Sequence, residues 1–108
     1  MTNVKILNDK SGLHRGFEVS GHSGYAKSGN DIVCAAISVL TTNTINSIET
    51  FTDDFISYES DENTAFMKLI LEEESSHDAQ LLMDAMILGL STMAKAYPKN
   101  VRLTIEEV

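Results

Sequence analysis

Hydrophobic and polar residues alternate in two stretches near the start of the chain, which is the pattern of β-strands with one buried face. The first stretch is 3–7 (NVKIL) and the second is 13–20 (LHRGFEVS), in which Phe17 and Val19 share a face. Between them, NDKSG supplies the small polar residues and the glycine of a turn. The pattern therefore predicts an opening β-hairpin.

A helical period replaces this alternation over residues 31–50, which Asn30 or Asp31 is placed to cap. Side chains that recur there at steps of three and four form one face of a helix: Val33, Ile37, Leu40, Thr44 and Ile48. Residues 53–72 then have the pattern of a second hairpin that turns at DEN, and 101–105 (VRLTI) alternate as a last strand.

A second helix is predicted between that hairpin and the last strand. It begins at SSHD, where Ser75 and Asp78 have the S-x-x-D form of a capping box, and Pro98 ends it. Its apolar face consists of Leu82, Met86, Leu90, Met93 and Tyr97. The predicted order, β-β-α-β-β-α-β, indicates an α+β fold, a mainly antiparallel sheet with two helices packed on it.

Composition limits the class of protein. A length of 108 residues, with 43% hydrophobic and 22% charged, suits one domain with one modest core. There are 16 Asp and Glu against 8 Lys and Arg, and no basic stripe, so direct binding of nucleic acid is not expected. The carboxylates either favour basic partners or only keep a small protein soluble. Without a ~20-residue apolar run or a signal peptide's n- and h-regions, we expect a cytoplasmic protein with no membrane association.

The stretch GHSGYAKSGNDIVCAAIS holds the candidate chemistry, namely the only cysteine, Cys34, and one of three histidines, His22. Cys34 falls in the first turn of the predicted helix, where free backbone N–H groups and the helix dipole favour a thiolate and could stabilise an oxyanion. His22, at a strand end, could accept the thiol proton. Ser38 lies one turn beyond Cys34, on a polar face that also carries Thr41 and Thr42.

Each of these features also has an interpretation without catalysis. A lone cysteine in IVCAAI is most often a small buried hydrophobe, and Gly21, Gly24 and Gly29 commonly make turns, although they also allow a loop to move. One cysteine excludes an internal disulfide and a thiolate-rich zinc site. A buried thiol, a reactive thiol and an intermolecular link remain open, so spacing alone does not establish an enzyme.

The same stretch resembles the signature of the bacterial ribosomal-processing cysteine proteases, called Prp. The family pattern, G-H-x-G-Y-x-x-x-G-x-D-I-V-C-A-A-x-S, is met without departure. The matching residues are Gly21, His22, Gly24, Tyr25, Gly29, Asp31, Ile32, Val33, Cys34, Ala35, Ala36 and Ser38. The chain length and the predicted order of elements are also similar to those of the family.

The resemblance implies that residues 1–108 form a single cysteine protease domain and a homodimer. It implies a Cys–His dyad in which Cys34 is the nucleophile and His22 is the general base, with thioester formation and hydrolysis. The implied substrate is a large-subunit ribosomal protein with a short N-terminal extension, apolar and with paired aromatics before the cut, followed by a basic mature protein. No cofactor or metal is expected.

Five residues are expected to support the site or to contact substrate: Gly21, Gly24, Tyr25, Asp31 and Ser38. Asp31 could orient His22, but we favour a capping role for it. Tyr25 could line the pocket or pack the loop. The loop from His22 to Gly29 could close over the substrate.

Two other functions stay open. A ribosome-assembly factor could bind the same basic protein without cutting it, but a pure binder does not need both His22 and Cys34. A redox sensor could use Cys34 as a peroxidatic thiol, but the chain has no second cysteine to resolve a sulfenic acid. SHD at 76–78 has the letters of a serine triad but is expected to cap a helix, and His14 has no evident partner.

Overall fold

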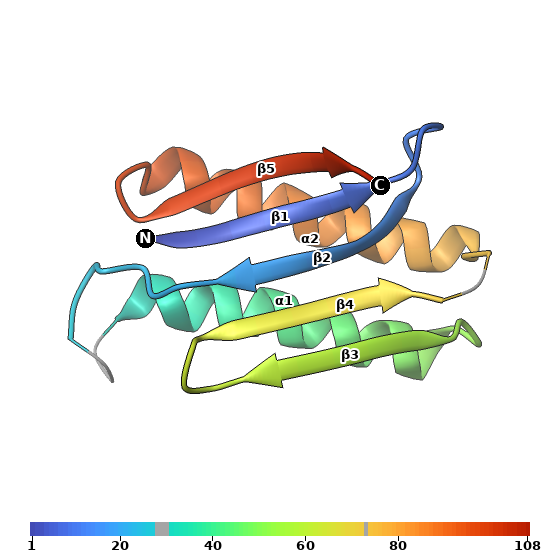
Figure 1. Ribbon diagram of the computed structural model, residues 1–108, viewed down its shortest axis with the longest axis horizontal. Coiled ribbons are helices and arrows are strands. Elements are labelled where there is room, and N and C mark those ends of the chain that lie inside the picture. The colour runs from blue at the N-terminus through green and yellow to red at the C-terminus, as the bar shows by residue number, and fades with distance from the viewer. Residues whose placement is uncertain (28–30, 73) are drawn as a thin grey trace.

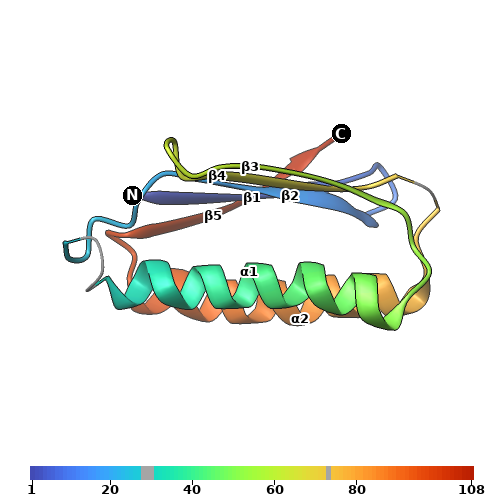
Figure 2. The ribbon, with the colours of Figure 1, turned by 90° about the horizontal axis from the view of Figure 1, so that it is seen from below.

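The fold is seen in a computed structural model, which describes residues 1–27, 31–72 and 74–108. Its elements follow the predicted order: β1 (Thr2–Asn8), β2 (His14–Ser20), α1 (Ile32–Phe51), β3 (Ile56–Asp61), β4 (Phe66–Leu71), α2 (His77–Ala96) and β5 (Val101–Glu107). The strands form one sheet, and both helices lie on the same face of it (Figure 1, Figure 2). The predicted α+β fold is confirmed.

The strand order in the sheet is β3-β4-β2-β1-β5. β1 with β2, β2 with β4, and β3 with β4 pair antiparallel, whereas β5 runs parallel to β1. The pairing of β2 with β4 and the parallel edge strand follow from how each helix crosses the sheet, which strand periodicity does not reveal. The central strand β2 ends beside the start of α1 (Figure 1), and this end of the sheet carries the site.

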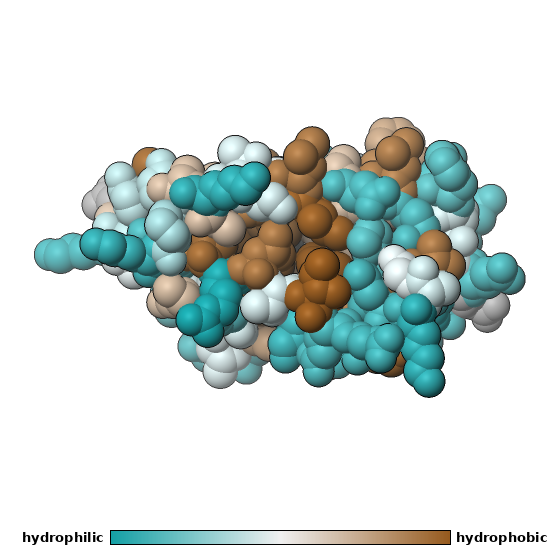
Figure 3. Space-filling view, turned by 90° about the horizontal axis from the view of Figure 1, so that it is seen from above, coloured by the Kyte–Doolittle hydropathy of each residue, from teal (hydrophilic) through white to brown (hydrophobic). Residues whose placement is uncertain are grey.

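The core fills the space between the sheet and the helices. Ile6, Phe17 and Leu69 contribute fully buried side chains from the sheet, and Val33 and Ile48 do so from α1. By length and composition α1 could cross a membrane, but one face of it is built into this core. Apolar side chains remain exposed on the two helices and at the sheet edge, and the side of the molecule at β5 and α2 shows a hydrophobic band between hydrophilic ends (Figure 3).

The helix faces differ from the predicted ones at two places. Thr41, predicted on a polar face with Ser38, is buried, because its hydroxyl donates to the Ile37 carbonyl oxygen at 2.8 Å and so needs no water. In α2, Leu82 packs against the core and is partly buried, like Met93 and Tyr97, whereas Met83, which the predicted face omits, is fully buried. Periodicity finds an amphipathic helix but leaves its rotation uncertain by about one residue.

Helix α2 begins one residue later than the capping box predicts. Ser76, and not Ser75, is the N-cap, and its hydroxyl accepts the Ala79 N–H at 3.1 Å. The Asp54 carboxylate accepts a hydrogen bond from the Ser76 N–H at 2.8 Å. The Ser75 hydroxyl instead accepts one from Gln80 Nε2 at 2.7 Å. The hydrogen bond from Ser76 to Asp54, 22 positions earlier in the chain, therefore favours Ser76 over Ser75 as the N-cap.

His14 has close partners, contrary to the expectation from the sequence. Its Nδ1 lies 2.7 Å from Asn8 Oδ1, and its Nε2 lies 2.6 Å from Asp84 Oδ1. Gln80 also binds the backbone N–H and carbonyl of His14. These bonds fasten the β1–β2 hairpin to α2 at the end of the sheet opposite to His22, so they are structural.

Candidate active site

His22 lies two residues beyond the end of β2, where the chain leaves the sheet. Gly21 makes this exit with a φ of 84°, in the left-handed region that favours glycine. A Cβ at Gly21 would also come within 2.5 Å of the Met1 carbonyl oxygen. The Thr2 hydroxyl donates to the Gly21 carbonyl at 3.3 Å. The start of β1 therefore fixes the point from which the His22 side chain projects.

We expect Gly21→Ala to lower the free energy of unfolding by about 1–3 kcal/mol, because alanine meets both the strained φ and the Met1 carbonyl. Gly12→Ala is the matched control, since Gly12 has a φ of 91° but no atom within 4 Å of an added Cβ. Urea denaturation of both variants measures the difference. Equal losses would show that the close approach to Met1 contributes nothing.

Cys34 lies in the first turn of α1, with its side chain partly buried. Asp31 is the N-cap, as favoured from the sequence, and its Oδ1 accepts the Cys34 N–H at 2.9 Å. The alternative cap, Asn30, lies outside the described residues. Because the cap engages the Cys34 N–H, the first-turn donors left for an oxyanion are those of Ile32 and Val33, which have no acceptor among the described residues.

Ser23 completes the surroundings of the thiol, and it is not among the residues predicted to support the site. It is only 1% exposed, and its backbone N–H donates to Cys34 Sγ at 3.3 Å. Its hydroxyl donates to Asp31 Oδ2 and accepts the Tyr25 N–H at 3.2 Å. Ser23 fills a variable position of the motif, and serine is a mostly exposed residue type, so the sequence carries no signal for its burial.

The hydrogen bond from Ser23, together with that from the Cys34 N–H, lowers the pKa of Asp31 from 3.8 to about 2. Asp31 is therefore ionised throughout the neutral range. Among the described residues it makes no hydrogen bond to His22. The geometry supports a capping role for Asp31, and an orienting role is not seen.

Cys34, His22 and Ser38 stand between two hollows in the surface. The hairpin cavity, of about 370 Å³, lies between α1 and the β3–β4 hairpin, and its lining includes Ile37 and Met67. The loop cavity, of about 390 Å³, also borders Cys34. It is lined additionally by Gly24, Ala26, Asp31 and Ala35. Within the described residues, the three that line both cavities are Cys34, His22 and Ser38.

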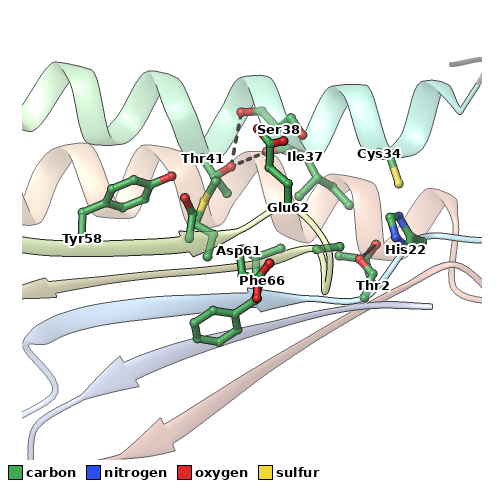
Figure 4. Close-up of a pocket in the computed structure, with 15 residues that line it drawn as sticks. Thr2, His22, Cys34, Ile37, Ser38, Thr41, Tyr58, Asp61, Glu62 and Phe66 are labelled. Atoms are coloured by element: carbon green, nitrogen blue, oxygen red, sulfur yellow. Dashed lines mark hydrogen bonds between the residues drawn. The ribbon is translucent and has the colours of Figure 1, made fainter. Parts of the chain in front are cut away.

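The side chains of Cys34 and His22 face one another at the end of the hairpin cavity. Figure 4 shows the Cys34 sulfur directed from the start of α1 toward the His22 ring. No hydrogen bond joins the two side chains in the part of the chain that the structure describes. His22 is exposed, so its ring is accessible to solvent beside the partly buried thiol.

Tyr25 packs the loop and does not line either cavity. Its ring meets the Tyr97 ring edge to face, with centroids 5.4 Å apart and an interplanar angle of 88°. Gly24, with a φ of 72°, turns the chain back before Tyr25 and lines the loop cavity. Gly29 lies outside the described residues, so closure of the loop over a substrate stays a prediction.

Known proteins share this arrangement of elements over nearly the whole chain. The family model described as "Cysteine protease Prp" matches residues 1–102. The ribosomal processing cysteine protease Prp of Staphylococcus aureus (strain Mu50 / ATCC 700699) is 27% identical over 103 residues, which are 95% of this chain and 97% of that protein. The protein of that name from Bacillus subtilis (strain 168) is 28% identical over 92 residues, 82% of each chain.

A solved structure extends this similarity to three dimensions. The crystal structure of the S. aureus ribosomal processing protease Prp, in complex with a covalently linked product peptide, aligns with a TM-score of 0.94 at 26% identity. The alignment covers 98% of this chain and 100% of that one.

Proposed function

Since the chain belongs to the Prp family of cysteine proteases, we propose that it is a ribosomal processing endopeptidase with Cys34 as nucleophile and His22 as general base. Its substrate is the N-terminal extension of a large-subunit ribosomal protein. The observation that carries the proposal is the position of Cys34, His22 and Ser38 at the junction of two cavities. An endopeptidase binds its substrate on both sides of the scissile bond, so its reacting groups must lie between two binding regions.

The geometry supports a stepwise acyl transfer. His22 takes the thiol proton, and the Ser23 N–H stabilises the resulting thiolate. The Cys34 sulfur attacks the scissile carbonyl carbon, the C–N bond breaks, and His22 returns the proton to the leaving amine. Water, deprotonated by His22, then hydrolyses the thioester and releases the thiol. First-turn N–H groups of α1 hold the oxyanion in both steps.

The hairpin cavity suits the apolar side chains of the proposed extension. In the paired strands, Tyr58 lies opposite Leu69 and Ser60 opposite Met67, and Leu69 is buried against the helices. Because side chains alternate along a strand, Tyr58 and Met67 also face α1 and line the cavity. Asp61 and Glu62 add carboxylates to the lining at the hairpin turn, so the cavity also carries negative charge, which favours a peptide with basic residues.

We expect Met67→Ala to raise KM for an extension peptide by about 5- to 20-fold with kcat little changed, because it removes apolar contact made equally before and during reaction. Ile70→Ala is the matched control. Ile70 follows the buried Leu69 in β4, so it lies on the opposite face of the hairpin, and it does not line the cavity. Steady-state peptide kinetics measure both, and an equal rise in KM would contradict the assignment of the cavity.

The proposed function is tested with a synthetic peptide in which an apolar segment ending in paired aromatics is joined to a basic segment. Incubation with the protein is expected to yield two fragments, identified by mass. Tight binding without fragments would support the assembly-factor alternative and overturn the protease proposal.

We further propose that residues 1–108 act as a single protease domain, that the protein is cytoplasmic, and that it forms a homodimer. Exposed apolar side chains such as Leu88 and Ile105, 71% and 68% exposed, support an association of copies. They belong to α2 and β5, the elements of the side shown in Figure 3.

A further inference from the structure

The loop that carries His22 is joined to a residue near the opposite end of the chain. Asn100 Nδ2 donates a hydrogen bond to the Ser23 carbonyl oxygen at 3.0 Å, although the two residues are 77 positions apart. Asn100 lies in the turn between α2 and β5. Its own N–H donates to the Tyr97 carbonyl at 2.9 Å, and its carbonyl accepts the Thr2 N–H at 2.8 Å. Its backbone is thus held on two sides, and its amide group contacts the loop.

The residue that Asn100 holds is the one whose N–H points at the thiol. Ser23 is fixed by its carbonyl to Asn100, by its hydroxyl to Asp31, and by its N–H to Cys34 Sγ. Because Ser23 is buried, its carbonyl oxygen would find no water to replace the Asn100 amide, and an unsatisfied buried carbonyl is costly. Loss of the bond from Asn100 therefore favours a rotation of Ser23, and this rotation moves the Ser23 N–H away from the sulfur.

The orientation of Ser23 matters because another group near the sulfur acts in the opposite sense. The Asp31 carboxylate is ionised at neutral pH and also interacts with the Cys34 side chain. A carboxylate close to a thiol disfavours the thiolate, whereas a hydrogen bond from an N–H favours it. Ser23 reduces the effect of Asp31 on the thiolate in two ways. Its hydroxyl donates to one carboxylate oxygen of Asp31, and its N–H donates to the Cys34 sulfur.

We propose that Asn100 is a positioning residue of the active site, which holds Ser23 so that the Ser23 N–H stays on the Cys34 sulfur and stabilises the thiolate. Asn100 acts through Ser23 and is not itself catalytic. The consequence for cleavage rests on the proposed role of Cys34 as nucleophile, but the effect on the thiol does not.

The test compares Asn100→Asp and Asn100→Ala with the unmodified protein. Asn100→Asp keeps the shape but replaces the N–H donor by an oxygen that repels the Ser23 carbonyl, and Asn100→Ala removes the group without adding charge. The rate of alkylation by iodoacetamide is measured against pH, and Cys34 is the only thiol that can react. Both variants are expected to move the midpoint of the profile upward by about 0.5–1 pH unit, the equivalent of one lost hydrogen bond.

Cleavage of the extension peptide provides the second readout, with kcat/KM expected to fall about 3- to 10-fold, chiefly through kcat. Asn46→Asp, on the exposed surface of α1, is the control for the added charge and should leave both readouts unchanged. An upward shift of the alkylation profile in the Asn100 variants supports the proposal. A failure of every form to cleave the peptide would overturn only the proposed protease function. An unmoved profile in both Asn100 variants, with only a lower denaturation midpoint, would show a purely structural role and overturn the proposal.

Discussion

Replacing Cys34 by alanine is expected to abolish peptide cleavage, with kcat/KM reduced by at least about 10⁴-fold. The thiol is the only one in the chain, and it stands at the junction of the hairpin and loop cavities, so no second nucleophile of this kind can take its place. Cys34→Ser should be almost equally inactive, because a hydroxyl is far less acidic than a thiol. Product formation from the extension peptide, followed by mass, measures the effect.

Binding is the control for the Cys34 variants. Both should still bind the uncleaved peptide, because the cavities remain and only the reacting atom is lost. Cleavage by Cys34→Ala at the unmodified rate would refute the nucleophile assignment. Equal binding by all three forms with no cleavage by any would favour the assembly-factor alternative.

We expect His22→Ala to lower kcat by about 10²- to 10⁴-fold, the contribution usual for a positioned general base. The same variant should slow alkylation of Cys34 at neutral pH, because the thiol then lacks the imidazole that faces it (Figure 4). His77→Ala is the matched control, since the His77 side chain is 86% exposed at the start of α2 and lies outside both cavities. Kinetics on the peptide distinguish the two variants.

The assignment of His22 as the base would be contradicted by a His22→Ala variant that keeps kcat within a few-fold of the unmodified protein. A loss shared equally by His77→Ala would point to a general effect of imidazole removal. In that case the facing arrangement of His22 and Cys34 would have no bearing on catalysis.

Local signals predicted the elements well. The alternation in β1 and β2, the helical period of α1 and the stop at Pro98 each depend on neighbours within four positions. β1, β2 and α1 formed where expected, and α2 ends before Pro98. Asp31 caps α1 for the same reason, because the cap joins residues only three apart. Some errors arose where a distant partner intervened, because Asp54 binds Ser76, which caps α2 in place of Ser75, and Asp84 pairs with His14. The burial of Thr41 has a local cause, since its hydroxyl binds the carbonyl oxygen four residues before it.

By itself, the sequence determined the fold class, the family signature and the two residues proposed as the dyad. These are encoded in periodicities and in a contiguous motif. Tertiary structure alone decided that His22 and Cys34 share two cavities, that Ser23 is buried with its N–H on the sulfur, and that Asn100 holds Ser23 from 77 positions away. The reason is that separation along the chain carries no information about distance once a sheet and two crossing helices have brought its two ends together.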